Sequence, residues 1–181
     1  MKLQLVVANK NYSSWSMRAW VLLREAGIPF EEISLRFNDE GHIPGIERHS
    51  PSGQVPVLVI DAEPVWDSLA IGETVAELFP DKLLWPRDAR ARRLARSICA
   101  EMHAGFRTLR GAMPMNLRGS YPGMGMSEEV QRDIDRILAN WTQCRERFGR
   151  GGELLFGGFT AADAYYAPVA SRFATCGSCT P

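Results

Sequence analysis

Cysteine is missing from the first half of this 181-residue chain, because all four cysteines lie from Cys99 onward. A first half without thiols excludes thiol–disulfide exchange by that part of the protein, since the exchange needs a protein thiolate. The uneven placement of the cysteines also differs from the disulfide framework of a small secreted protein. We therefore expect a cytoplasmic protein.

An excess of one charge and a long apolar run are missing as well. Lysine plus arginine number 21 and aspartate plus glutamate also number 21, so no net charge favours binding to nucleic acid or to an anionic membrane. No apolar run approaches the roughly 18 residues of a membrane span. The start, Met1-Lys2-Leu3-Gln4, lacks the pattern of a signal peptide. We expect neither a nucleic-acid partner nor a membrane partner.

The first thirty-odd residues predict a strand, a helix and a second strand. Residues 3–8 form an apolar run, residues 14–26 carry apolar side chains at helical spacing, and residues 30–37 alternate as a strand does. Gly27 suits the left-handed position after a helix, and Pro29 blocks its continuation. A unit this compact implies a right-handed parallel crossover.

The next motif is Gln54-Val55-Pro56, which leads into the β-branched run 57–60. Pro56 has no N–H to donate, so it must begin a strand, and a proline here is often cis. Val55 would then present its N–H and C=O to an extended ligand. After a turn at 61–64 and a brief strand, Ser68 is expected to cap a helix over 68–79, where an anion can bind. The alternative is an ordinary strand, turn and capped helix.

The second half predicts helices. A helix is expected over about 88–113 and another over 127–148, followed by Thr160-Ala161-Ala162-Asp163 as a variant capping box. Five arginines near the start of the first helix form either a solvated helix face, which we favour, or an anion or nucleic-acid patch: Arg87, Arg90, Arg92, Arg93 and Arg96.

No metal site is predicted. Cys176 and Cys179 have the spacing of a redox or zinc half-site, but the pair lacks two further zinc ligands and we favour an accidental or truncated end. His103 is a lone histidine without a ligand pattern around it.

Three motifs together resemble a known family. Ser13-Ser14-Trp15-Ser16-Met17-Arg18, Gln54-Val55-Pro56 and Asp67-Ser68 occur in the order and spacing of the glutathione-binding half of a glutathione S-transferase. The resemblance extends over about residues 1–173 and is greatest to serine-type bacterial enzymes near the zeta and tau classes. It implies an α/β domain followed by an all-α domain: a thioredoxin-like βαβ-ββα domain at 1–80, a linker at 81–86 and a shortened helical domain at 87–181. The Cys-x-x-Cys position of redox-active thioredoxin-like proteins is Ser13-Ser14-Trp15-Ser16 here.

The resemblance also implies roles for single residues. Ser13 matches the catalytic serine, which would stabilise the glutathione thiolate, and its alternative role is that of a plain helix cap. Val55 would pair with the cysteinyl part of glutathione, and Asp67 and Ser68 would hold the γ-glutamyl amine and carboxylate. Gln54 and His42 are further candidate contacts.

A second substrate, a small electrophile, would lie against the long helix, and the candidate contacts are Trp15, His103, Phe106 and Arg110. Ordinary packing is the alternative for His103 and Phe106. Trp15 stands where zeta-type enzymes have a cysteine, which weakens an isomerase assignment.

The resemblance implies a cytoplasmic homodimer that conjugates glutathione, as co-substrate and without a metal, to an electrophile in detoxification. The alternatives are a non-catalytic glutathione-binding or regulatory protein and a glutathione-dependent isomerase of the maleylacetoacetate type, or a dehalogenase, on the same scaffold. The short C-terminus should leave apolar faces around Tyr166, Val169 and Phe173 exposed. We therefore expect a protein that is less stable than a full-length relative or that is stabilised by a partner chain.

Overall fold

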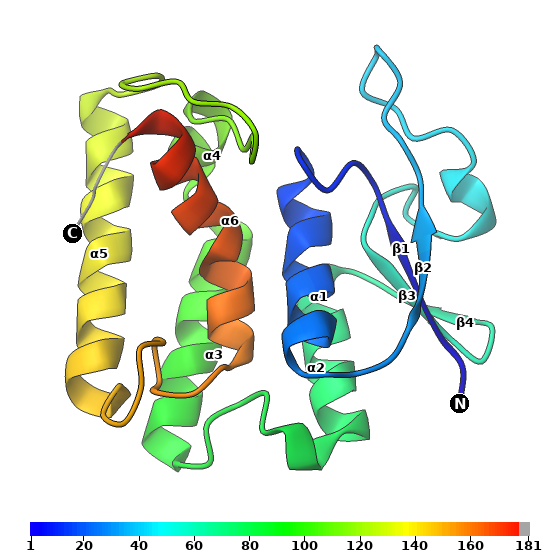
Figure 1. Ribbon diagram of the computed structural model, residues 1–181, viewed down its shortest axis with the longest axis horizontal. Helices are drawn as coiled ribbons and strands as arrows, with labels where there is room; N and C mark the ends of the chain where they lie inside the picture. Colours follow the sequence, from blue (N-terminus) through cyan, green and yellow to red (C-terminus); the bar gives the residue numbers. More distant parts are fainter. Residues whose placement is uncertain (178–181) are drawn as a thin grey trace. The chain divides into compact units, whose positions relative to one another are not determined.

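The computed structural model describes residues 1–177, which divide into one compact unit, Met1–Lys82, and a second that begins at Leu83 (Figure 1). The elements of the first unit are β1 (Leu3–Val7), α1 (Ser14–Glu25), β2 (Glu31–Ser34), the 3-10 helix η1 (Ile46–Arg48), β3 (Val57–Ile60), β4 (Glu63–Val65), α2 (Ser68–Leu78) and the 3-10 helix η2 (Pro80–Lys82). The elements of the second unit are α3 (Ala89–Ala104), α4 (Arg107–Ala112), α5 (Glu128–Phe148) and α6 (Ala161–Cys176). The predicted fold class is confirmed.

The first unit is built on a four-stranded mixed sheet in the order β2-β1-β3-β4. β1 pairs in parallel with β2 and antiparallel with β3, which in turn pairs antiparallel with β4. Figure 1 shows α1 and α2 on the same side of this sheet. Since β1 is central, its apolar residues Leu5, Val6 and Val7 are fully buried. The predicted βαβ unit followed by ββα is therefore present.

Strand β2 is shorter than the run 30–37 that the alternation predicts. β1 ends at Val7, and Leu35, the residue after β2, still donates its N–H to Val7 O at 2.8 Å. Phe37 instead donates its N–H to the side chain of Asn9, at 2.8 Å. The strand therefore ends early because its partner strand does.

The cap of α2 differs from the prediction by one residue. Asp67, rather than Ser68, is the N-cap, and its carboxylate accepts the N–H of Leu69 at 3.0 Å. Both residue types cap helices well, so the residue types alone do not locate the cap. The prediction that Ser68 caps this helix is wrong, and Ser68 is the first helical residue.

The expected helix over 88–113 is interrupted at Gly105 and Phe106. Phe106 has the left-handed backbone angle φ 55°, and α4 begins after it. A β-carbon at residue 105 would lie 2.7 Å from the carbonyl oxygen of Glu101, so this close approach requires glycine. The Arg110 guanidinium donates to the carbonyls of His103 at 3.2 Å and Gly105 at 3.1 Å. The single-helix prediction is wrong for this reason.

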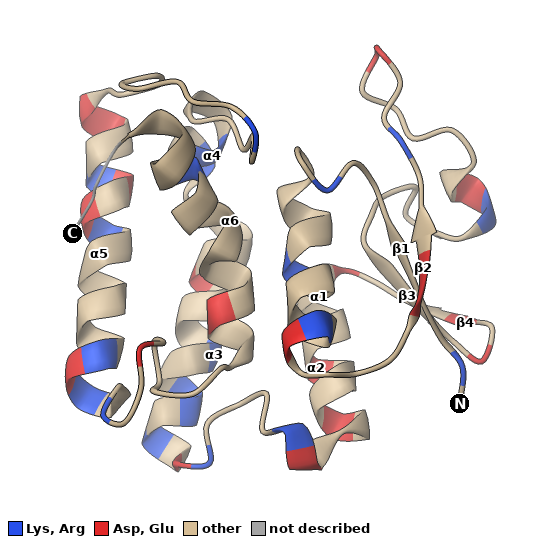
Figure 2. Cartoon of the chain, in the orientation of Figure 1, with Lys and Arg blue, Asp and Glu red and all other residues tan. Residues whose placement is uncertain are grey.

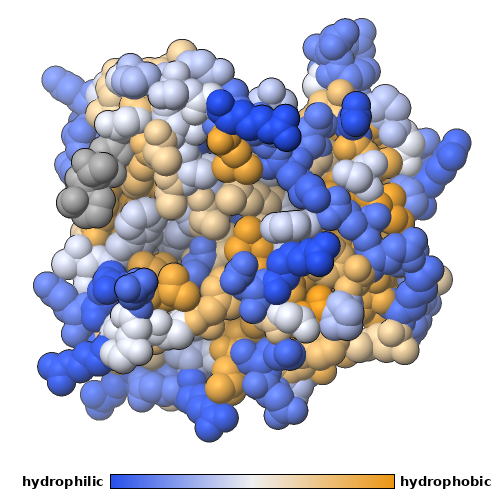
Figure 3. All heavy atoms as spheres, in the orientation of Figure 1, coloured by the Kyte–Doolittle hydropathy of each residue, from blue (hydrophilic) through white to orange (hydrophobic). Residues whose placement is uncertain are grey.

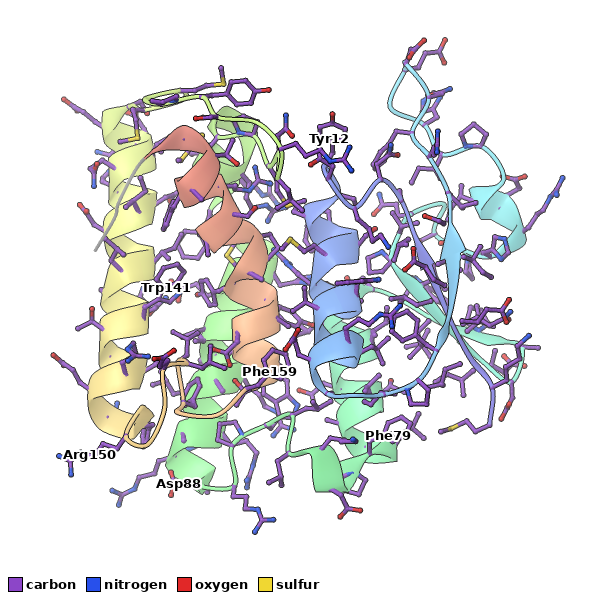
Figure 4. All side chains as sticks on the ribbon, viewed as in Figure 1. Tyr12, Phe79, Asp88, Trp141, Arg150 and Phe159 are labelled. Atoms are coloured by element: carbon purple, nitrogen blue, oxygen red, sulfur yellow. The ribbon has the colours of Figure 1, made fainter. Side chains whose placement is uncertain are left out.

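Helix α6 is buried along most of its length in the second unit. Figure 2 shows charges of both signs along α5 and few on α6. Trp141 points from α5 toward α6 (Figure 4), where its ring lies 5.7 Å from that of Tyr166 and 5.8 Å from that of Phe173. Tyr166, Val169 and Phe173 are 2%, 1% and 5% exposed. The prediction that these faces are exposed is wrong, because α3 packs along α6 and Trp141 of α5 covers the rings of Tyr166 and Phe173.

The arginines at the start of α3 make local structural contacts. Arg92 donates to the carbonyls of Pro86 at 3.0 Å and Arg87 at 2.8 Å, and Arg96 lies over the ring of Trp85 at 5.4 Å. These contacts fix the entry to α3, which agrees with the favoured reading of a solvated helix face.

None of the helices among residues 1–177 is both long and apolar enough to cross a membrane. Cys176 is buried at the end of α6, whereas Cys179 lies outside the described residues. The interpretation of that cysteine pair stays a prediction.

Glu101 joins α3 to α5 and gives the second unit a measurable response to acid. Its carboxylate accepts from Arg136 at 2.7 and 3.1 Å and from Asn140 at 2.9 Å. The Arg136 hydrogen bond lowers the pKa of Glu101, and the Asn140 amide acts in the same direction. A lowered folded-state pKa gives stability that is present above the unfolded value and is lost as the pH falls through the folded value.

We therefore expect Glu101→Gln to lower the free energy of unfolding at neutral pH, by less than about 1 kcal/mol because the pair is partly exposed. The difference from the parent protein should shrink as the pH falls below the ordinary glutamate pKa of about 4.3. Urea midpoints measured across this range test the expectation, and Arg136→Met should reproduce it. A difference that stays constant with pH would contradict it.

Candidate functional site

Ser13 stands at the head of α1, where a short polar turn ends. Its backbone is extended, with φ −82° and ψ 93°, and its Oγ accepts the backbone N–H of Ser16 at 3.3 Å. The residue is 6% exposed. Ser13 is therefore the N-cap of α1, and the positive end of the helix dipole lies beside its hydroxyl.

A second hydroxyl lies directly against that of Ser13. Ser13 Oγ–H donates to Ser16 Oγ at 2.9 Å, and Ser16 Oγ also accepts the backbone N–H of Ala8 at 3.1 Å. Ser16 and Ala8 are both fully buried. The two serines thus form a short hydrogen-bonded chain that begins at the backbone just after β1. No role for Ser16 was predicted from the sequence.

A pocket of about 540 Å³ opens beside Ser13 within the first unit. Its volume falls in the range of roughly 300–1,000 Å³ that is usual for small-molecule sites. The lining includes five residues predicted from the sequence: Ser13, Trp15, His42, Gln54 and Val55. It also includes five that were not predicted: Phe37, Gly41, Ile43, Ile46 and Gly53.

The segment before β3 supplies one side of this pocket. The Val55–Pro56 peptide bond is cis, as expected for a proline at this point. The ladder between β1 and β3 runs from Val57 to Ile60, so the backbone of Val55 lies before it. The Ser50 hydroxyl accepts the N–H of Gln54 at 3.2 Å and donates to its carbonyl at 2.8 Å. These bonds fix Gln54 and position Val55 at the rim of the pocket.

Segment 38–52 supplies another wall of the pocket through Gly41, His42, Ile43 and Ile46. Ile46 packs with Val6 and Val57 in one buried cluster, and Ile43 lies against it. The tip is a tight turn in which the Asn38 side chain accepts the N–H groups of Glu40 and His42, at 3.1 and 2.8 Å. Figure 3 shows this tip as hydrophilic. The two isoleucines were the only sign in the sequence that the segment is anchored to the core.

His42 lies on the exposed side of this wall. Its Nδ1 is 3.5 Å from a carboxylate oxygen of Glu40, and both side chains are about three-quarters exposed, at 76% and 77%. A histidine held this loosely can meet a ligand but is not preoriented by the protein.

Asp67 and Ser68 lie at the start of α2 and do not line the pocket beside Ser13. Asp67 is exposed, whereas Ser68 is 1% exposed. An exposed carboxylate is available to a ligand ammonium, but a hydroxyl this buried is not open to a ligand in this arrangement. The predicted roles of both residues stay predictions.

The candidate electrophile contacts belong to different units of the chain. In the first unit, the Trp15 ring packs against the Arg18 guanidinium at 4.3 Å. In the second, Arg110 holds the break between α3 and α4, and burial lowers the pKa of its guanidinium. Phe106 is 8% exposed and shapes the same break. Packing accounts for Phe106 and Arg110, and an electrophile role for any of these residues, His103 included, stays a prediction.

Comparison with known proteins adds independent findings. The family described as the N-terminal domain of glutathione S-transferase matches residues 12–78. A curated relative from Caenorhabditis elegans, described as "Probable maleylacetoacetate isomerase", is 28% identical over 104 residues, which are 58% of this chain and 48% of that protein. The chain thus spans about half the length of the curated relative that it matches.

Several solved structures of glutathione transferases resemble this chain over a longer stretch than the curated relative does. A glutathione transferase homologue from Burkholderia gl BGR1, crystallised with bound glutathione, is 25% identical, with a TM-score of 0.71 over 100% of this chain and 86% of that one. A Tau class glutathione S-transferase from mango, Mangifera indica, is 17% identical, with a TM-score of 0.66 over 93% of this chain and 74% of that one. An Omega 3C glutathione transferase from Trametes versicolor is 20% identical, with a TM-score of 0.66 over 96% and 73%. At 17% and 20% identity, the mango and Trametes versicolor structures show only that this chain shares their fold.

Proposed function

We propose that this chain binds glutathione and conjugates the thiolate to a small electrophile, because its residues 12–78 match the N-terminal domain of the glutathione S-transferase family. The observation that carries the proposal is the buried hydroxyl of Ser13, which caps α1 and lines a pocket together with Gln54 and Val55. The solved homologue with bound glutathione supports glutathione as the ligand.

The chemistry requires that the ligand's thiol be ionised near neutral pH. A free thiol has a pKa of about 8.5, and lowering it by two units requires roughly 2.7 kcal/mol of preference for the thiolate. A hydrogen bond from a hydroxyl to a charged acceptor contributes about 1.5–3 kcal/mol. The positive end of α1 adds roughly 0.3–1 kcal/mol. Ser13 and its helix are therefore sufficient, and Ser13 acts as a hydrogen-bond donor rather than as a general base.

The rest of the tripeptide would be held by the first unit. The Val55 backbone, outside the ladder of β3, offers strand-like pairing to the extended cysteinyl part. Gln54 and His42 line the same pocket and offer polar contacts. The exposed carboxylate of Asp67 offers a countercharge to the γ-glutamyl ammonium.

Calorimetric titration of glutathione into the protein, with thiolate absorbance followed against pH, tests the proposal directly. We expect saturable binding and a bound thiol whose pKa lies about two units below the free value of about 8.5. Turnover of an activated aryl halide is the expected activity. Binding without turnover of any electrophile would instead favour the non-catalytic role, and turnover of maleylacetoacetate alone would favour the isomerase. Absence of binding would refute all three.

Similarity to glutathione transferases also supports a cytoplasmic homodimer that acts in detoxification. Sedimentation of the purified protein tests the oligomeric state. A monomer at all concentrations would contradict the homodimer without affecting the proposed chemistry, since the pocket beside Ser13 is formed within one unit.

A further inference from the structure

Ser16 has no part in the function proposed so far, although its hydroxyl touches that of Ser13. The two Oγ atoms are 2.9 Å apart. Ser13 lines the pocket and Ser16 does not. Ser16 is fully buried, so solvent does not compete for its hydrogen bonds.

The hydrogen-bonding capacity of the two hydroxyls limits what Ser13 can do. A serine hydroxyl has one proton to donate and two lone pairs to accept with. Ser13 accepts the backbone N–H of Ser16 and donates its proton to Ser16 Oγ. Its donor is thus already used within the protein. Donation to a ligand thiolate requires that this proton turn away from Ser16.

We propose that Ser16 is a positioning residue for Ser13, and that its hydroxyl reverses to donate to Ser13 Oγ when Ser13 donates to the glutathione sulfur. This inference rests on the proposed function. Only two O–H bonds rotate, and the 2.9 Å contact between the oxygens serves both arrangements. A hydrogen bond from Ser16 Oγ–H to Ser13 Oγ replaces the one from Ser13 Oγ–H to Ser16 Oγ. Rotation of the Ser13 O–H bond toward the sulfur therefore costs little free energy.

The reversed arrangement also strengthens the donor. Ala8 N–H continues to donate to Ser16 Oγ at 3.1 Å, so the chain runs from the Ala8 backbone through Ser16 and Ser13 to the sulfur. Hydrogen bonds arranged in such a chain polarise one another, by about 10–30% per bond. Ser13 then holds both of its lone pairs in hydrogen bonds, one from Ser16 N–H and one from Ser16 Oγ–H, while its proton points to the ligand.

A purely structural role for Ser16 makes a different prediction. If the side chain did no more than tie α1 to the end of β1 through Ala8, its loss would lower stability and leave the bound thiol unchanged. The discriminating quantity is therefore the pKa of the thiol of bound glutathione, rather than turnover alone.

The experiment compares Ser16→Ala with Ser14→Ala, a serine on the same turn that does not line the pocket. Thiolate absorbance of bound glutathione is followed against pH in both variants and in the parent protein. Ser16→Ala should raise the thiol pKa by about 0.5–1 unit, a change of about 3- to 10-fold in the ratio of thiolate to thiol. Affinity for S-methylglutathione, which has no ionisable thiol, should stay within about twofold, because the hydrogen bond concerns only the charged sulfur. Ser14→Ala should match the parent in both measurements.

Ser16→Cys is a second variant that retains side-chain volume but donates weakly, and the same rise in thiol pKa is expected from it. If Ser13→Ala raises the thiol pKa while both Ser16 variants match Ser14→Ala, the positioning role is overturned and the proposed function stands. If the parent protein leaves the thiol pKa at its free value, the proposed function and this inference fail together.

Discussion

Ser13→Ala should lower kcat/KM at slightly acidic pH by about 10- to 150-fold, the equivalent of one hydrogen bond to a charged acceptor. Because the lost donor stabilises only the thiolate, affinity for glutathione should stay within a few-fold. The thiol pKa should rise toward its free value, so the activity deficit should narrow as the pH is raised. Steady-state kinetics across pH, with calorimetric binding, check each of these results.

Ser13 is also a helix cap, so its replacement has a structural cost that must be separated from the chemical one. Ser13→Gly removes the same hydroxyl at a smaller capping cost. Ser127→Ala is the matched control, since Ser127 caps α5 by accepting the N–H of Val130 at 3.2 Å. The control should lose stability and keep its activity. Unchanged conjugation in Ser13→Gly would rule out the catalytic role.

Among the substitutions considered for stability, Asp163→Ala should lower the free energy of unfolding the most. The Asp163 carboxylate accepts the N–H of Leu155 at 3.0 Å, the N–H of Thr160 at 2.8 Å and the hydroxyl of Thr160 at 2.9 Å. These bonds start the buried helix α6 and join it to the loop before it. Removing the carboxylate leaves poorly exposed donors without an acceptor, so we expect a loss of about 2–4 kcal/mol in the free energy of unfolding. Urea unfolding followed by tryptophan fluorescence measures it.

The matched comparison is Asp88→Ala at the start of α3. Asp88 accepts two backbone N–H groups, those of Arg90 at 2.9 Å and Ala91 at 2.8 Å, and it caps a helix at a more exposed position. We expect a loss of about 1 kcal/mol there, the usual value of an N-cap. If Asp163→Ala and Asp88→Ala lost the same free energy of unfolding, the bond to Leu155 and the burial of α6 would contribute nothing to the stability of the cap.

The features that could be predicted from the sequence depend on interactions between residues close together in the chain. Ser13 is recognisable as a cap because a helical pattern begins after it, and Pro56 must begin a strand because it lacks an N–H. The capping box at Thr160 and Asp163, predicted from four residues, is confirmed. Each of these features depends on atoms within a few residues of one another.

The features that the sequence did not reveal depend on tertiary contacts. Ile43 and Ile46 join the core only because the segment 38–52 folds back onto Val6 and Val57. The left-handed conformation of Phe106 has no pattern in the sequence, because bulky residues rarely adopt it. The burial of Phe173 depends on Trp141, 32 positions earlier in the chain. The role inferred for Ser16 required the distance between two oxygens.

The anchoring of segment 38–52 affects how such a protein can adapt to new ligands. Ile46 belongs both to the pocket wall and to the buried cluster with Val6 and Val57, so a substitution there changes ligand preference and fold stability together. Gly41 and His42 line the same pocket but are exposed at the turn. Selection for altered specificity is therefore least constrained at the rim, whereas substitutions deeper in the wall require compensation elsewhere in the core.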